Sequence, residues 1–198
     1  MFKIRGNRSF LRTDYEISSI DKNEADSAFK LYKKQYIDTL LKSRGFLKFK
    51  ANAYVRRNQV DVLEYLDLQK EKNGSRTFTV NYGLTALYIP RKFFSLDYNQ
   101  RLGMLICKND IWWDFANDTI AKVSFENVAK AIEEFVIPWF DARSNDDSIK
   151  SMLLDESEDD GWNRSSKHTW LEMIDHRCDL YGTIEENIKI FGLHKSLS

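Results

Sequence analysis

The sequence predicts an α+β protein in which helices pack on one face of an antiparallel sheet of about five strands, followed by a C-terminal helical extension. Residues 77–84 alternate apolar and polar side chains, as in a strand with one buried and one polar face. Residues 23–44 and 124–140 instead repeat apolar side chains at steps of three and four, as on one face of an α-helix. The segments between the strands are too short for crossover helices, so we expect antiparallel pairing.

The first helix and the strand after it have clear boundaries. Asp21 with Glu24 resembles a capping box, and Gly45 is a typical stop after the last turn of the helix. Residues 46–57 then alternate apolar and polar side chains, which predicts a strand.

A hairpin at residues 60–84 forms the centre of the predicted sheet. Its strands flank Lys72-Asn73-Gly74-Ser75, and Asn-Gly supplies the positive φ angles of a tight reversal. Residues 86–94 are apolar and contain Pro90, which predicts a strand that ends there or lies at an edge. Two further short apolar runs follow at residues 101–107 and 111–115, and the sheet should have about five strands in all.

Ser124 is the expected N-cap of the second helix, which should end near Phe140.

Composition changes after residue 142. Residues 144–163 are strongly acidic and predict a solvated linker, and two amphipathic helices should follow. We therefore expect an α+β domain at residues 1–142 and an acidic linker with a helical appendage at 143–198. The appendage should dock through Trp162, Trp170 and Phe191.

Composition also limits the classes of protein to consider. Of the 198 residues, 42% are hydrophobic and 14% aromatic, which is enough for a substantial core. No apolar run approaches the roughly 18–20 residues that cross a bilayer, and residues 1–20 lack the apolar core of a signal peptide. The two cysteines are too few for a disulfide framework. We expect a cytoplasmic protein without a membrane partner.

Charge is balanced overall but not along the chain. Residues 1–60 hold 14 Lys and Arg against 6 Asp and Glu, a net charge of +8, so the remainder has −8. The simplest interpretation is that a basic helix and an acidic loop neutralise each other. A nucleic-acid interface would require basic clusters with exposed aromatics, an RNP-like strand or a helix-turn-helix signature. The sequence contains none of these, so we expect no nucleic-acid partner.

Five motifs follow one another in a fixed order between residues 28 and 142. They are a helix running into Gly45-Phe46, a strand end Tyr54-x-Arg56, a strand ending Leu66-Asp67-Leu68-Gln69-Lys70, the run Phe78-Thr79-Val80-Asn81-Tyr82-Gly83, and the pair Trp112-Trp113. In this order they resemble the bacterial domain of unknown function numbered 4304. The resemblance implies a fold and no established activity. It also implies, by analogy of architecture, a similarity to small immunity and accessory proteins of bacterial toxin systems.

Histidine placement excludes several kinds of chemistry. The three histidines, His168, His176 and His194, all lie in the predicted appendage, so a Ser-His or Cys-His nucleophile in residues 1–142 is excluded. The sequence has no glycine-rich phosphate loop. Neither the histidines nor the acidic run has the spacing of a metal site. We expect no metal and no cofactor.

The central hairpin supplies the candidate ligand-binding residues. The strand pattern places Glu64 on the apolar face, where burial would raise its pKa and suit it to acid or base chemistry. A bulge could instead turn Glu64 outward, or Arg56 or a helix lysine could pair with it. The other candidates share the polar face, where they either bind a ligand or simply face water: Gln69, Thr77, Thr79 and Asn81.

Three classes of function remain open. The leading hypothesis is a protein-binding or adaptor module that uses an open sheet face or an edge strand, and a toxin-immunity protein is one form of it. Its partner contacts would be one Trp and an acidic group that steers a basic partner: Trp113, Asp155, Glu156, Glu158, Asp159 and Asp160. The alternatives are a carboxylate-dependent enzyme or small-ligand-binding protein that uses the central sheet face, and a structural protein that self-associates. The sequence leaves the oligomeric state open.

Overall fold

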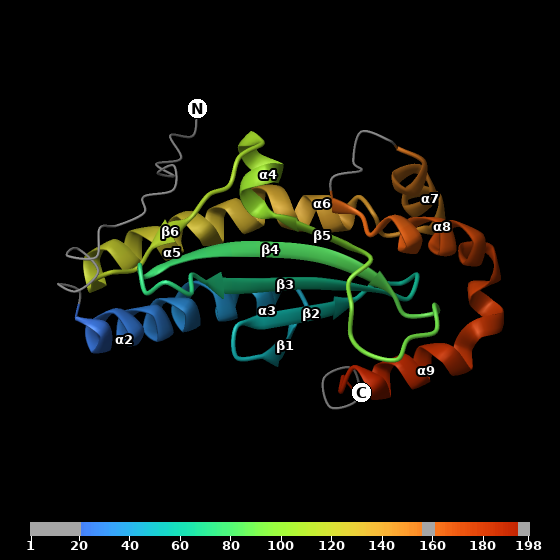
Figure 1. The fold of residues 1–198 in the computed structure, drawn as a ribbon, viewed down its shortest axis with the longest axis horizontal. Helices are drawn as coiled ribbons and strands as arrows, with labels where there is room; N and C mark the ends of the chain where they lie inside the picture. Colours follow the sequence, from blue (N-terminus) through green and yellow to red (C-terminus); the bar gives the residue numbers. More distant parts are fainter. Residues whose placement is uncertain (1–20, 156–160, 194–198) are drawn as a thin grey trace. The chain divides into compact units, whose positions relative to one another are not determined.

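The structure, a computed structural model, describes residues 21–155 and 161–193 and contains a six-stranded antiparallel sheet (Figure 1). Five strands lie in sequence order, β1-β2-β3-β4-β5, and β6 pairs with β4. The α+β prediction is confirmed, with one strand more than expected. The strands are β1 (Leu47–Lys50), β2 (Ala53–Arg57), β3 (Val62–Lys70), β4 (Thr77–Ala86), β5 (Tyr98–Arg101) and β6 (Trp113–Asp114).

Two long helical segments each contain a π-helical stretch. The first comprises α2 (Lys22–Tyr32), η1 (Lys33–Asp38) and α3 (Thr39–Ser43), and the second comprises α5 (Asp118–Ala131), η2 (Ile132–Val136) and α6 (Ile137–Asp141). The other helices are α4 (Leu102–Cys107), α7 (Asp146–Leu154), α8 (Arg164–Met173), the 3₁₀ segment η4 (Ile174–Leu180) and α9 (Tyr181–Ile190). Among the described residues, no helix is both long enough and apolar enough to cross a membrane.

The chain folds as two compact units. The first comprises residues up to Phe46 together with Asp67–Asn81 and Arg101–Ile137. The second comprises Leu47–Leu66, Tyr82–Gln100 and the residues from Pro138 onward. Strands β3 and β4 each contribute residues to both units. The division at residue 142 stays a prediction.

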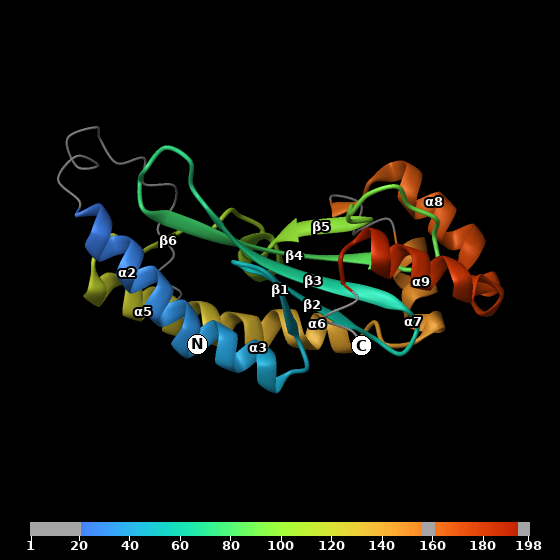
Figure 2. The same ribbon diagram turned by 90° about the horizontal axis from the view of Figure 1, so that it is seen from below.

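The core of the first unit is aromatic. Phe29 on α2 meets Phe78 on β4 edge to face, with ring centroids 5.4 Å apart, and Phe78 stacks on Phe125 of α5 at 4.8 Å. Phe115 completes the cluster at 4.9 Å from Phe29. Such ring pairs stabilise a fold by about 0.5–1.5 kcal/mol each beyond the area they bury. Helices α2 and α5 therefore cover one face of the β4 segment in this unit (Figure 2).

The second unit packs its C-terminal helices through aromatic side chains. Trp162 contacts Tyr98 of β5 at 5.3 Å, Trp170 donates a hydrogen bond to Tyr88, and Phe191 meets Phe94 at 5.2 Å. The prediction that Trp162, Trp170 and Phe191 dock the appendage is confirmed within this unit. Gly83 is required on β4, because a Cβ atom there would lie 2.4 Å from the Tyr98 carbonyl oxygen.

Local predictions fail where short apolar runs are ambiguous. Residues 102–107 form α4 instead of a strand, with Gly103 packed so closely that a Cβ atom would lie 2.2 Å from the Asn109 carbonyl. Strand β4 ends at Ala86, so residues 87–94 do not form the expected strand. Helix α5 starts at Asp118 and not near Ser124, because the Asn117 side chain caps it by accepting from the Ile120 N–H.

The acidic stretch after residue 142 also differs from the prediction. Residues 146–154 form α7, and the linker expectation is wrong there. A capping box explains the helix: the Asn145 side chain accepts from the Ser148 N–H, and the Ser148 hydroxyl bonds back to the Asn145 backbone.

Candidate functional site

Polar side chains of the β3–β4 hairpin meet in the first unit. Asn81 Nδ2 donates to Asp67 Oδ1 at 3.2 Å and to Gln69 Oε1 at 3.0 Å. The Glu71 N–H donates to the Thr77 carbonyl at 2.9 Å, and this register puts Gln69 opposite Thr79 and Asp67 opposite Asn81. We call Asp67, Gln69, Thr79 and Asn81 the amide cluster.

The amide cluster has hydrogen-bonding capacity left over. Asn81 is 9% exposed and uses both hydrogens of its amide, while its Oδ1 receives no donor from the described residues. Gln69 is exposed, and its Nε2 has no acceptor in the same part of the chain. A carboxamide offers two donors and an acceptor oxygen. The cluster thus retains one acceptor atom, Asn81 Oδ1, and one donor group, Gln69 Nε2.

Thr79 adds an unusual hydroxyl group to the cluster. Its side chain is fully buried, and its Oγ1 has no hydrogen-bond partner among residues 21–155 and 161–193. More than about 90% of buried polar groups in proteins have a partner, so each exception requires an explanation. Burial of Thr79 and Asn81 also means that the polar face is not solvated at these positions.

A charged corner fixes the end of the hairpin in the first unit. Lys70 Nζ lies 2.9 Å from Asp26 Oδ1 and 4.0 Å from the centre of the Phe29 ring. The hydrogen bond from Lys70 is the main cause that lowers the pKa of Asp26, with burial acting in the opposite direction. The contacts of Lys70 with Asp26 and Phe29 fix the end of β3. Gln69 is the residue before Lys70, so its backbone position in the amide cluster is fixed as well.

Thr77 does not join the amide cluster. Its hydroxyl lies 2.8 Å from the hydroxyl of Ser75, which is almost fully buried. Of the predicted polar row, the structure therefore brings Gln69, Thr79 and Asn81 together.

Glu64 belongs to the second unit and is 1% exposed. Burial raises its pKa to about 7, although the neighbouring Arg56 acts to lower it. The Arg56 guanidinium donates from Nε to Glu64 and from Nη2 to Asp141 Oδ1 at 2.7 Å. The expected burial and the expected pairing with Arg56 thus both occur. Glu64 is the buried end of an ion pair, which leaves it poorly placed to act as a base.

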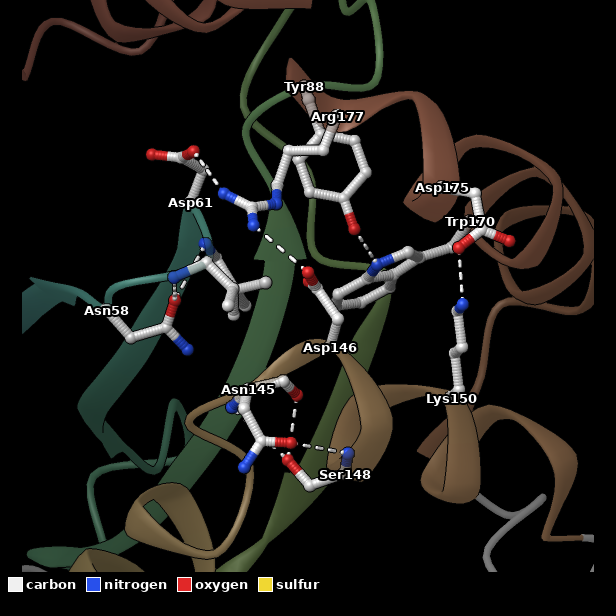
Figure 3. A network of polar contacts seen from close by, with 12 residues as sticks. Asn58, Asp61, Tyr88, Asn145, Asp146, Ser148, Lys150, Trp170, Asp175 and Arg177 are labelled. Carbon is white, nitrogen blue, oxygen red and sulfur yellow. Dashed lines mark hydrogen bonds and ion pairs between the residues drawn. The ribbon is translucent and has the colours of Figure 1, made fainter.

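A further polar network ties the second unit together (Figure 3). Arg177 donates to Asp61 Oδ2 at 3.1 Å and to Asp146 Oδ2 at 3.0 Å, and so links η4 to the β2–β3 turn and to α7. Asp61 has a φ of 58°, a left-handed conformation that Asp tolerates better than most residues. Burial raises the pKa of Tyr88, which accepts from Trp170 in the same region. These groups point at one another, which indicates a structural role.

The predicted partner contacts are only partly accessible. Trp113 is 4% exposed and its ring lies 6.1 Å from that of Phe78, so it is the core member of the pair. Trp112 is more exposed, with the Arg101 guanidinium 5.3 Å from its ring. Asp155 is exposed at the end of α7. The remaining acidic candidates lie outside the described residues: Glu156, Glu158, Asp159 and Asp160.

Sequence reasoning did not select Asp67 for the site. One signal was available, because the period-two alternation of the strand places Asp67 on the same face as Gln69. The pairing of Asp67 with Asn81 depends on the observed register, in which Glu71 lies opposite Thr77. The described residues contain no group of three or more His, Cys, Asp and Glu side chains that could hold a metal ion.

Comparison with known proteins identifies the family. A family model described as "Domain of unknown function (DUF4304)" matches residues 37–142, which is more than half of the chain and includes the whole amide cluster. No curated protein and no solved structure matches the chain. The chain belongs to the DUF4304 family.

Proposed function

We propose that this chain is a non-catalytic recognition module that binds a protein partner through the amide cluster. The observation behind the proposal is the incomplete hydrogen bonding of the Asn81 side-chain amide. Asp67 and Gln69 fix its amide in one orientation, and no donor among the described residues reaches its Oδ1. An acceptor that is oriented in advance and has no internal donor is suited to an external N–H group.

The chemistry of the cluster matches a peptide group. A peptide bond offers one N–H donor and one carbonyl acceptor. Asn81 Oδ1 would accept from the N–H, while Gln69 Nε2, on the side chain 3.0 Å from the Asn81 amide, would donate to the carbonyl. Main-chain hydrogen bonds of this kind are a general mode of peptide recognition.

An enzymatic role has less support. Carboxamides do not titrate, so Asn81 and Gln69 can position a ligand but cannot transfer protons. Glu64, the other candidate, is paired with Arg56. A toxin-immunity-like role is one specific form of the proposal, in which the partner is a toxin, and it is supported only by the resemblance of the family architecture.

Affinity capture with matched variants tests the proposal. Tagged wild-type protein, Gln69→Ala, Asn81→Ala and the control Gln35→Ala, which changes an exposed Gln of η1 in the same unit, would be incubated with lysate of the native host. We expect one stoichiometric protein that wild type and Gln35→Ala retain and that the two cluster variants lose by about tenfold, the effect of roughly one or two hydrogen bonds.

The salt dependence of capture separates this proposal from recognition by the acidic residues. Neutral hydrogen bonds are little affected by salt, whereas contacts between exposed charges are screened. A partner that stays bound at high salt supports the amide cluster. Equal retention of the partner by wild type and all three variants would contradict recognition by the amide cluster. Release of the partner from each protein at high salt would contradict it too.

A further inference from the structure

The loop of residues 87–97 in the second unit exposes one aromatic side chain and partly buries the next. Phe93 is 71% exposed, more than any other large hydrophobic side chain that the structure describes. Phe94 turns inward, where its ring lies 5.2 Å from Phe49, 5.5 Å from Tyr65 and 5.2 Å from Phe191. Because Phe94 is fixed among three rings, its neighbour Phe93 is held in the solvent.

Buried polar contacts keep this loop in place. Asn187 of α9 donates from Nδ2 to the carbonyls of Leu87 and Ile89, both at 2.7 Å, and its Oδ1 accepts from the Arg91 N–H at 3.2 Å. Asp97, which is fully buried, pairs with the Arg91 guanidinium. Exposure of Phe93 is therefore a property of an anchored loop. Anchored loops lose little conformational entropy on binding.

Exposed lysines lie next to Phe93 in the loop and beside the Phe94 ring. Lys92 precedes Phe93 and is exposed, and Lys50 Nζ lies 4.9 Å from the Phe49 ring and 5.8 Å from the Phe94 ring. The acidic residue of the loop, Asp97, is buried and paired, so it does not offset these charges. The surface is complementary to an anionic and partly apolar partner.

We infer that Phe93, with Lys92 and Lys50, forms a docking surface for an acidic protein segment, separate from the amide cluster of the first unit. The segment would receive the Phe93 ring between apolar side chains and place carboxylates on the lysines. Aromatic side chains anchored near the centre of a contact commonly dominate binding energy. Pairing of a strand along β1 fits less well, because β1 has four residues, two of them Lys, and a break in register between Lys48 and Lys50.

A peptide titration tests this inference. The probe is a fluorescein-labelled peptide of alternating Glu and Leu, followed by fluorescence anisotropy at low and high salt. Phe93→Ala should weaken binding by about tenfold or more, Lys92→Glu by about fivefold, and high salt should weaken it further. Tyr181→Ala, an aromatic 63% exposed on α9, and Lys122→Glu, exposed on α5, are the matched controls and should bind as wild type does.

Several results would overturn the inference. They are no binding of the peptide by wild-type protein, equal binding by Phe93→Ala, and equal binding of an all-Glu peptide, which would show that Phe93 is not used. Tighter binding of a single-stranded oligo-dT would assign the surface to nucleic acid. Self-association that Phe93→Ala abolishes, measured by sedimentation, would assign it to a second copy of the chain.

Discussion

Asn187 in the second unit and Asn81 in the first use the same side-chain amide to different ends. Each donates both amide hydrogens to oxygen atoms of the chain. The Oδ1 of Asn187 accepts from the Arg91 N–H, whereas no described residue donates to the Oδ1 of Asn81. Asn187 is thus fully satisfied and acts as a structural clamp. The difference indicates that completeness of hydrogen bonding separates groups that hold the fold from groups available for recognition.

The largest expected effect on stability comes from removing Asp97, a fully hydrogen-bonded group of the second unit. Asp97→Ala leaves Arg91, whose side chain is 13% exposed, without its ion partner, and removes the acceptor for the Thr85 hydroxyl and the Ala86 N–H. We expect a loss of about 3–5 kcal/mol in the free energy of unfolding, measured by urea titration. Asp110→Ala, at an exposed pair with Arg101, is the control and should cost less than about 1 kcal/mol. Similar losses of unfolding free energy in Asp97→Ala and Asp110→Ala would contradict a structural role for the buried Asp97.

The pH dependence of stability should reveal Glu64. Its pKa is about 7 in the fold against 4.5 ordinarily, so the folded state holds the proton more tightly than the unfolded state. The resulting contribution is fully present below about pH 4.5 and is lost as the pH rises to about 7; at 1.36 kcal/mol per pKa unit it amounts to roughly 3 kcal/mol. Urea titrations at several pH values should show this decline in wild type and a flatter profile in Glu64→Gln. If the stability of wild type and of Glu64→Gln varied with pH in the same way, the raised pKa of Glu64 would be contradicted.

The two asparagines can be compared directly. Asn187→Ala leaves two buried carbonyls and a backbone N–H without partners, so we expect a loss of about 2–3 kcal/mol in unfolding free energy. Asn81→Ala removes only side-chain contacts, one of them to the exposed Gln69, and should cost about 1 kcal/mol. Thermal and urea unfolding of both variants provide the measurement. A larger loss for Asn81→Ala would make it a structural residue and would reverse the comparison.

The smallest expected effect on stability is at Gln69. Its side chain is exposed, so Gln69→Ala should change the free energy of unfolding by less than about 0.5 kcal/mol. The same variant should lose the captured partner, because its Nε2 donor is gone. Partner loss that accompanies a large loss of stability would indicate unfolding and not recognition.

Periodicity made most of the fold predictable. The helix at residues 23–44 and the central hairpin follow from repeats long enough to distinguish a period of 3.6 from a period of two. Residues 102–107 are too short for that distinction, and their helix depends on the close approach of Gly103 to the Asn109 carbonyl. Helix α7 was hidden because its acidic residues suggested a linker, while its N-terminal signal is the Asn145 and Ser148 pair.

The candidate site was predictable only where it depends on local pattern. Alternation placed Gln69, Thr79 and Asn81 on one face, and the hairpin register adds Asp67. No local pattern shows that Asn187 meets carbonyls about a hundred residues earlier in the chain. Nor does the sequence show which of Phe93 and Phe94 faces solvent, because that depends on the packing of Phe94 against Phe49, Tyr65 and Phe191.

The most direct test of recognition by the amide cluster is calorimetric titration of the captured partner against wild type and Gln69→Glu. This substitution keeps the acceptor oxygen that Asn81 uses and replaces the Nε2 donor with a second oxygen atom. If the amide cluster binds the partner, Kd rises by about tenfold or more while the free energy of unfolding changes by less than about 1 kcal/mol. An unchanged Kd would contradict recognition by the amide cluster.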